Sequence, residues 1–200
     1  MADLRFYFGT MGSGKSTLAL QIHHNLSSRG LVGLLCTRMD REGGRVSSRL
    51  GVSAEAVEVH DSLDLYDHAV QFISEVGRLD HLVCDEAQFY RPEQADQLAR
   101  VVDELGVDVH ALGLLTDFRG QLFAGTARLL EVADELIQLQ VEARCWCGAR
   151  ATHNARVVNG LQVYEGDVVG VGDVAGEQAV SYELLCRRHW RQGRPGPHLP

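Results

Sequence analysis

One segment near the N-terminus places the strongest constraint on how this chain can fold. Residues 9–17 match the phosphate-binding loop pattern G-x-x-x-x-G-K-[ST]. The apolar run 4–8 before it predicts a buried strand, and the four-residue spacing of apolar side chains over 17–29 predicts a helix after it. A strand, a glycine loop and a helix together aim backbone N–H groups at an anion. The predicted phosphate site consists of Gly9, Thr10, Met11, Gly12, Ser13, Gly14, Lys15, Ser16 and Thr17.

Lys15 is the only lysine of the chain, which otherwise uses arginine for its basic residues. A lysine ammonium is a compact point charge that fits between phosphate oxygens, whereas a guanidinium is a planar fork. A lysine kept at this one position therefore indicates a site that needs its shape. The alternative is a glycine-rich turn without a ligand, and the matching strand and helix on either side disfavour it.

Short apolar runs alternate with helical patterns along the rest of the chain. Strands are predicted at 31–37, 57–59, 81–84, 107–115 and 135–141, and helices at 63–76 and 92–105. Asp61 or Ser62 is expected to cap the first of these helices, and the glycine-punctuated stretch 38–51 is expected to be a loop. The alternation predicts an α/β fold of the P-loop NTPase type, with a parallel sheet and helices on both faces.

The bulk composition limits the possible partners. A hydrophobic fraction of 45 % over 200 residues suits one globular domain with a small additional module. The net charge of −8 argues against non-specific binding to nucleic acid or to a membrane. No apolar run approaches the roughly 20 residues that span a bilayer, and no signal peptide precedes the first strand. We therefore expect a cytoplasmic protein without a nucleic-acid or membrane partner.

Two acidic residues, Asp85 and Glu86, follow the apolar strand predicted at 81–84. Ligands bind at the carboxyl ends of strands in open α/β sheets, so this pair and the glycine loop are expected at one edge. The Ser16 hydroxyl and the Asp85 carboxylate suit Mg²⁺, and Glu86 could accept a proton from an attacking hydroxyl. The alternative is a solvated loop, which the nearby phosphate loop disfavours.

A cysteine cluster near the C-terminus predicts a structural zinc site. Cys145, Cys147, Cys186 and His189 supply three thiols and one imidazole, a set that tetrahedral zinc accepts. Unpaired reduced cysteines are the alternative, and His153 and His198 compete for the imidazole position. Cys36 and Cys84 lie in apolar runs and are expected in the core.

The organisation predicted from these patterns has three parts. Residues 1–141 form the P-loop α/β domain, residues 142–190 a small zinc-ribbon β module, and residues 191–200 a disordered tail rich in proline, glycine and arginine. Within the module, the β-branched stretch 157–174 with its regular glycines predicts short strands and a flexible loop.

Taken together, these residues resemble the cytosolic, zinc-containing (type II) thymidine kinases over about residues 4–189. The resemblance is carried by the phosphate loop, by Asp-Glu-Ala-Gln-Phe at 85–89, by Thr-Asp-Phe-Arg-Gly at 116–120 and by the cysteine module. It implies transfer of the γ-phosphate of ATP to the 5′-hydroxyl of thymidine, with Mg²⁺ near Ser16 and Asp85 and with a structural zinc ion.

The resemblance also implies roles for individual residues. Glu86 is the general base, Lys15 and the loop amides bind phosphate, and Arg41 stabilises the transition state, with Arg45 and Arg49 as alternatives. The residues implied in ATP binding include Asp85 and Gln88, and those implied in thymidine binding are Phe89, Phe118, Phe123, Tyr182 and Val171, the last in a lasso loop at 168–174.

The chain departs from the family pattern at two places. Asp40 and Arg41 are adjacent where many relatives have Asp-x-Arg, and one residue separates Cys145 from Cys147 where many relatives have two. The resemblance further implies a homotetramer inhibited by dTTP. Two rival functions stay open from the sequence: a P-loop ATPase that acts on nucleic acid, and a non-catalytic nucleotide-sensing module.

Overall fold

A parallel six-stranded sheet forms the larger part of the molecule. The computed structural model describes residues 1–38, 44–48, 51–139, 143–166, 168 and 179–196. Every neighbouring pair in the six-stranded sheet is parallel, as the alternation of strands and helices predicts. From edge to edge the strands are β5 (Val57–Glu58), β2 (Gly33–Thr37), β6 (His81–Cys84), β7 (Asp108–Leu114), β1 (Leu4–Gly9) and β8 (Glu135–Gln138).

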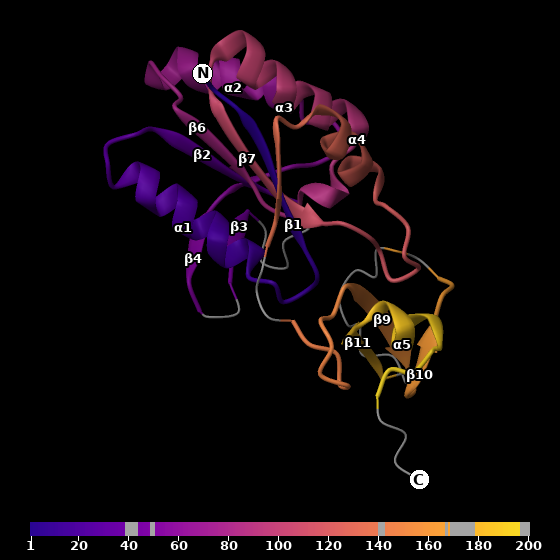
Figure 1. Ribbon diagram of the computed structural model, residues 1–200. Helices are drawn as coiled ribbons and strands as arrows, with labels where there is room; N and C mark the ends of the chain where they lie inside the picture. Colours follow the sequence, from indigo (N-terminus) through magenta and orange to yellow (C-terminus); the bar gives the residue numbers. More distant parts are fainter. Residues whose placement is uncertain (39–43, 49–50, 140–142, 167, 169–178, 197–200) are drawn as a thin grey trace.

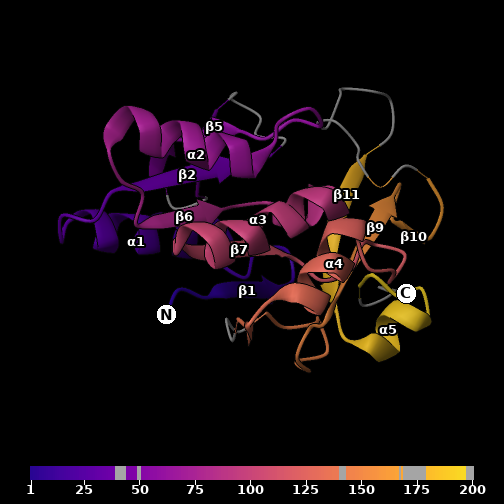
Figure 2. The ribbon, with the colours of Figure 1, turned by 90° about the horizontal axis from the view of Figure 1, so that it is seen from above.

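Helices cover both faces of this sheet (Figure 1). Alternate residues of a strand point to opposite faces, so Leu82 and Cys84 of β6 join one core cluster and Val83 joins the other. Helix α1 (Lys15–Ser27) packs on the Val83 face. Figure 2 shows the helices of the other face in a row, namely α2 (Leu65–Val76), α3 (Pro92–Leu105) and α4 (Ala124–Val132).

The helix ends follow from local side-chain chemistry. Helix α3 has the predicted bounds: Pro92 is its first residue, the Gln94 side chain accepts from the Arg91 N–H, and Gly106 ends it with a φ of 68°. Helix α2 begins later than predicted, because Asp64 is its N-cap and accepts from the Asp67 N–H at 2.9 Å. The caps proposed from sequence, Asp61 and Ser62, were therefore wrong.

Several elements were not predicted. The stretch 38–51, expected to be a loop, contains β3 (Arg45–Ser47), which pairs with β4 (Ser53–Glu55) as an antiparallel hairpin. The hairpin packs on the α1 face through the buried side chain of Val46. Helix α4 was also missed; it is nine residues long and carries no side-chain N-cap that would mark its start.

The C-terminal module, residues 143–196 as described, lies beyond the carboxyl ends of β1 and β7 (Figure 1). Its antiparallel sheet has the order β10 (Leu161–Val163), β9 (His153–Val158), β11 (Val180–Leu185), and is followed by α5 (Arg187–Arg191). Asn159 and Gly160, both with positive φ, make the β9–β10 turn.

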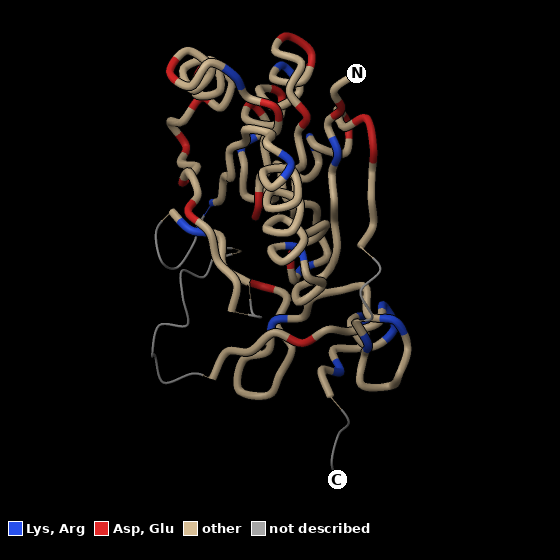
Figure 3. The backbone as a smooth tube through the Cα atoms, turned by 90° about the vertical axis from the view of Figure 1, so that its left-hand side faces the viewer, with Lys and Arg blue, Asp and Glu red and all other residues tan. Residues whose placement is uncertain are grey.

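The start of the tail differs from the disorder predicted from residue 191. Arg191 ends α5, and the Arg194 N–H donates to the His189 carbonyl at 3.0 Å. Residues 197–200 lie outside the described part. In Figure 3, many acidic residues lie at the end of the sheet that is remote from the module, and several basic residues lie in the module, with others along the helices.

Candidate active site

The phosphate loop folds back on its own lysine. Lys15 is the first residue of α1 and is only 7 % exposed; its ammonium donates to the Thr10 carbonyl at 2.9 Å and lies 3.5 Å from the Ser13 hydroxyl. Gly12 and Gly14 have φ values of 70° and 79°, which L side chains rarely adopt. The loop therefore surrounds one buried ammonium at a helix N-terminus, an arrangement that favours an anion.

A side chain of the C-terminal module supports this loop. The Met11 N–H donates to Oδ1 of Asn154, a buried residue of β9, at 2.9 Å. The two residues are 143 positions apart, so no local sequence pattern reveals the contact. A residue of the small antiparallel sheet therefore holds the backbone of the loop.

Asp85 lies directly after β6 and is almost completely buried. Burial raises the pKa of its carboxyl to about 6, with a further contribution from the negative charge of Glu86, while a hydrogen bond from Ser16 opposes the rise. Its Oδ1 atom has no hydrogen-bond partner among the described residues. A buried carboxylate oxygen beside a hydroxyl suits a hard divalent cation, so the prediction for Ser16 and Asp85 fits the site.

Glu86 is held by the amide of Gln88. Glu86 has a φ of 53°, an unusual conformation for a residue other than glycine and one that is concentrated at functional sites. Gln88 Nε2 donates to Glu86 Oε2 at 2.5 Å, and Gln88 Oε1 accepts from the Leu114 N–H at 2.9 Å. The buried Gln88 amide therefore connects the end of β7 to the Glu86 carboxylate, whereas the sequence placed Gln88 only among the ATP-binding residues.

The lack of a side chain at Gly113 leaves room for the Gln88 amide. A Cβ atom on Gly113 would lie 2.9 Å from Gln88 Oε1 and 3.0 Å from the Gln88 nitrogen. A side chain at position 113 would therefore displace the residue that orients Glu86. No local pattern indicates this requirement, since Gly113 lies inside the apolar run of β7.

The aromatic residues implied in nucleoside binding fall into two groups. Phe89 and Phe123 meet edge to face, with ring centroids 5.4 Å apart. Phe118 is only 3 % exposed, and the guanidinium groups of Arg119 and Arg156 lie 5.9 and 5.6 Å from its ring centre. The sequence did not single out either arginine as a neighbour of Phe118.

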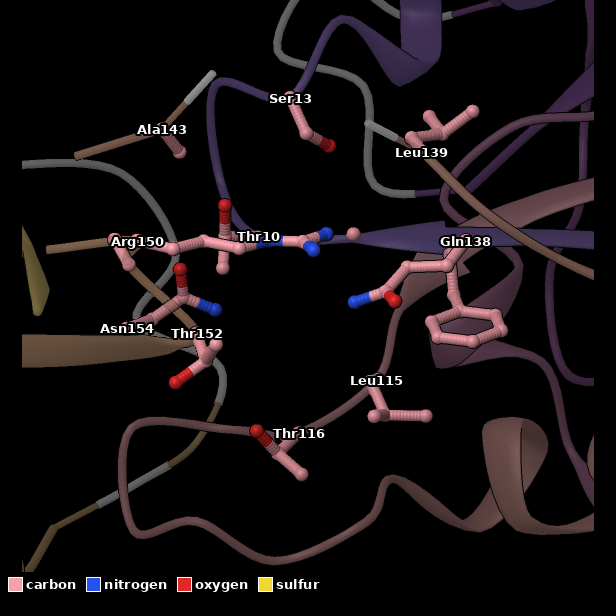
Figure 4. Close-up of a pocket in the computed structure, with 13 residues that line it drawn as sticks. Thr10, Ser13, Leu115, Thr116, Gln138, Leu139, Ala143, Arg150, Thr152 and Asn154 are labelled. Atoms are coloured by element: carbon pink, nitrogen blue, oxygen red, sulfur yellow. The ribbon is translucent and has the colours of Figure 1, made fainter. Parts of the chain in front are cut away.

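Two hollows lie between the phosphate loop and the C-terminal module. The first, shown in Figure 4, has a free volume of about 40 Å³, which accommodates water but not a nucleotide; Thr152 and Asn154 stand on one side of it, and Leu115 and Gln138 on the other. The second is open and has a volume of about 430 Å³, within the range of small-molecule sites. Its lining residues are Met11, Arg144, Trp146, Tyr182, Glu183 and Leu184.

This second hollow brings a predicted nucleoside residue toward the phosphate loop. Tyr182 lies on β11, is 39 % exposed and shares the hollow with Met11. Arg45 lies on β3, where its guanidinium donates to the Ser53 hydroxyl at 2.8 Å. The predicted residues Arg41 and Val171, and the alternative Arg49, lie outside the described residues.

The four predicted metal ligands converge. Their ligand atoms all lie within 4.8 Å of one another, and the Sγ atoms of Cys145 and Cys186 lie 3.3 and 3.6 Å from His189 Nδ1. Ligand atoms around tetrahedral zinc are separated by roughly 3.5–3.8 Å. Backbone N–H groups at the start of α5, led by that of His189, lower the pKa of the Cys186 thiol. The cluster is consistent with a zinc site.

The short spacing of the first pair is accommodated by a tight turn. The Gly148 N–H donates to the Cys145 carbonyl at 2.8 Å, and Gly148 has a φ of 82°. The turn directs Cys147 Sγ to within 4.0 Å of Cys186 Sγ. His153 instead stacks on the ring of Trp190 and is not in the cluster; His198 lies outside the described residues.

Comparison with known proteins identifies the family. The thymidine kinase family model matches residues 2–190. The chain belongs to the thymidine kinase family. It is 60 % identical to a thymidine kinase of Streptomyces coelicolor, over 96 % of this chain and 90 % of that protein, and 56 % identical to one of Cutibacterium acnes, over 98 % and 91 %. Members of this family catalyse thymidine phosphorylation, so the two rival functions are not favoured.

Solved structures give a more distant likeness. A crystal structure of Pif1 helicase from Candida albicans matches with a TM-score of 0.41 and 17 % identity, over 69 % of this chain and 36 % of the helicase. This similarity is too low to bear on function. In the part of the chain that the structure describes, no helix is both long and apolar enough to cross a membrane.

Proposed function

We propose that this thymidine kinase transfers the γ-phosphate of ATP to the 5′-hydroxyl of thymidine through a site built at the ends of β1 and β6. Two observations together carry the proposal. The phosphate loop holds a buried lysine, and the Glu86 carboxylate is held in place by Gln88. The first group suits a triphosphate, and the second suits a hydroxyl that must lose its proton.

In this mechanism, the backbone N–H groups of residues 9–17 and the Lys15 ammonium bind the phosphates of ATP. Lys15 exchanges its contact with the Thr10 carbonyl for phosphate oxygens, which are stronger acceptors because they are charged. Glu86 accepts the proton of the 5′-hydroxyl while Gln88 holds the carboxylate in place. Phe89, Phe118, Phe123, Tyr182 and Val171 contact the nucleoside, and Arg41 stabilises charge on the transferred phosphoryl group.

Ser16 and Asp85 would hold Mg²⁺, since their oxygens adjoin and one Asp85 oxygen lacks a partner among the described residues. Bound there, the ion would neutralise charge on the phosphates. Cys145, Cys147, Cys186 and His189 would hold zinc with four protein ligands, which makes its role structural.

Replacement of Glu86 by glutamine tests the assignment of the base. Glu86→Gln keeps the shape of the side chain but removes its ability to accept a proton, so kcat for thymidine should fall by about 10²–10⁴-fold. ATP affinity, measured by fluorescent-nucleotide displacement, should change by less than about twofold, because we assign Glu86 to the acceptor hydroxyl and not to the phosphates of ATP.

Glu75→Gln is the matched control. Glu75 is exposed on α2, where it accepts from Gln71, so this variant should keep normal turnover. Normal turnover of Glu86→Gln would show that another group takes the proton. Loss of ATP binding in that variant would show instead that the loop itself had been disturbed.

We also propose the quaternary, regulatory and cellular properties implied by the family resemblance. These are a homotetramer, inhibition by dTTP and a cytoplasmic location. We further propose that residues 1–141 and 142–190 are separate structural units. Light scattering at several protein concentrations tests the tetramer, and a dTTP titration at fixed thymidine tests the inhibition. A monomer, or turnover unaffected by dTTP, would contradict the respective proposal.

A further inference from the structure

Trp190 connects the metal cluster to the loop that carries Phe118. It follows His189 on α5, and its indole N–H donates to the Phe118 carbonyl at 3.1 Å, across 72 positions of sequence. A Cβ atom on Gly120 would lie 2.7 Å from the Cη2 atom of the Trp190 ring. The indole therefore occupies the space that a side chain at position 120 would need.

The module fixes Trp190 from its other sides. The ring of His153 stacks on the indole with centroids 4.8 Å apart, and Tyr164 meets it edge to face at 5.4 Å. The Trp190 carbonyl accepts from Gln162 Nε2 at 3.0 Å and from the Tyr164 hydroxyl. Ring contacts from His153 and Tyr164, and hydrogen bonds from Gln162 and Tyr164 to its carbonyl, thus hold Trp190, so its indole is a rigid support for the turn.

The loop that Trp190 touches is itself a compact turn. The buried carboxylate of Asp117 accepts from the backbone N–H groups of Arg119 and Gln121 at 2.9 and 3.0 Å. The Gly120 N–H donates to the Asp117 carbonyl at 3.1 Å, and Gly120 has a φ of 78°. Because the turn is internally bonded, its contact with Trp190 sets the position of the whole turn, including Phe118.

We propose that Trp190 is a positioning residue for thymidine: it places the Phe118 turn and couples that turn to the metal cluster through its neighbour His189. The inference rests on the proposed contact between Phe118 and the nucleoside. Its consequence is that thymidine affinity depends on the metal module, while ATP affinity does not depend on Trp190.

The first test replaces Trp190 by phenylalanine, which keeps an aromatic ring but removes the N–H donor. Thymidine KM should rise by about 3- to 10-fold, the effect of one lost hydrogen bond, while kcat and ATP KM change by less than about twofold. Tyr66→Phe is the matched control: it also keeps an aromatic ring and removes one donor, but Tyr66 lies on α2, where the Arg100 guanidinium lies 3.9 Å from its ring centre. It should not reproduce the shift in thymidine KM.

The second test uses the close approach of Gly120. Gly120→Ala should raise thymidine KM, because its Cβ collides with the indole and its φ is unfavourable for alanine. Combination with Trp190→Phe should relieve the collision, so the double variant should show a smaller rise in thymidine KM than the product of the two single effects. Strictly multiplicative effects would overturn the proposed contact.

The third test measures the environment of the Phe118 turn directly and does not depend on enzyme activity. In Trp146→Phe, Trp190 is the only tryptophan left, so its fluorescence reports on the turn. Removal of the metal by a chelator should shift this emission and increase hydrogen exchange of the amides at 117–121. Unchanged emission and exchange after confirmed metal loss would overturn the coupling.

One further variant separates the two proposals. Phe118→Leu keeps an apolar side chain but removes the ring. If Phe118→Leu raises thymidine KM and Trp190→Phe does not, the inference about Trp190 is overturned and the nucleoside role of Phe118 stands. If Phe118→Leu leaves thymidine KM unchanged, the nucleoside role of Phe118 is overturned, and the inference falls with it.

Discussion

At the scale of single residues, the site depends on groups held in unusual states. Lys15 keeps its ammonium buried, and Glu86 keeps a left-handed backbone conformation that costs of order 1–3 kcal/mol. Such costs persist only where surrounding contacts impose them, and Gln88 and the Thr10 carbonyl supply those contacts here. The Glu86 carboxylate, which we propose as the base, is therefore set in place before substrate binds, whereas Lys15 is held by the Thr10 carbonyl until phosphate replaces it.

The role of Lys15 leads to a prediction about charge and shape. Lys15→Met should weaken ATP binding and reduce kcat/KM for ATP by at least about 10²-fold, because the loop loses the cation that faces the phosphates. Lys15→Arg keeps the charge but brings a larger planar group into a buried position, so it should also lose most activity. Steady-state kinetics with ATP as the varied substrate measures both effects.

The arginine variant acts as the control for charge alone. Full activity of Lys15→Arg would show that any cation is sufficient, and that the shape of the ammonium is irrelevant. Full activity of Lys15→Met would remove the phosphate-binding role of the loop altogether.

At the scale of elements, β6 has a buried titratable side chain at each end. Asp85 follows its carboxyl end, while His81 begins the strand and is buried beneath α1. His81 Nε2 and His23 Nδ1 are 3.1 Å apart, and a Cβ atom on Gly33 would lie 2.0 Å from the His81 ring. The imidazole is therefore enclosed by α1 and β2, far from water.

This enclosure predicts acid sensitivity. Burial, with the nearby positive charges of His23 and His110, lowers the pKa of His81 to about 4, while Asp80 and Asp108 oppose the shift. Because the unfolded chain takes up the proton near pH 6.5 and the folded chain only near pH 4, the free energy of unfolding should fall as pH drops through this window. The loss should reach at most about 3 kcal/mol.

Denaturant unfolding at pH 7.5 and at pH 4.5 measures the effect. His81→Leu removes the titrating group, so its loss of stability over this interval should be smaller than that of the unmodified protein. The exposed His60 is the control, and His60→Leu should leave the pH dependence unchanged. An equal loss in His81→Leu and the unmodified protein would contradict the prediction.

At the scale of the whole molecule, the C-terminal module contacts two loops that follow strands of the six-stranded sheet. Asn154 reaches the phosphate loop and Trp190 reaches the Phe118 turn, so the module touches both the phosphate side and the proposed nucleoside side of the site. Residues 143–196 contain seven arginines and five acidic residues, so the module has a small excess of positive charge. The net charge of the whole chain is −8, which favours a small-molecule substrate over a nucleic acid.

Metal removal tests the contribution of the module to the whole fold. His189→Gln should bind less than the one zinc per chain that elemental analysis is expected to find in the unmodified protein. Its Tm should fall by about 10 °C, since loss of a structural metal removes several kcal/mol of folding free energy. The exposed His24 on α1 is the control, and His24→Gln should keep both zinc and Tm. Full zinc content in His189→Gln would exclude this histidine as a ligand.

What the sequence determined by itself is local in origin. The phosphate loop, the bounds of α3 and the strand before Asp85 follow from patterns within 5 to 20 residues, because backbone conformation and side-chain periodicity are short-range properties. The choice of the four candidate metal ligands also came from the sequence, because thiol and imidazole chemistry indicates them without knowledge of the fold.

The features that only the tertiary structure decided are contacts between segments that are far apart in the sequence. The contacts Met11–Asn154 and Trp190–Phe118, and the orientation of the Gln88 amide between Leu114 and Glu86, each depend on a side chain that is ordinary in its own sequence neighbourhood. The hairpin of β3 and β4 was missed for the same reason, since its stability comes from packing of Val46 against α1 and not from its polar sequence. Propensity acts along the chain, whereas these contacts exist only once the sheet has brought the segments together.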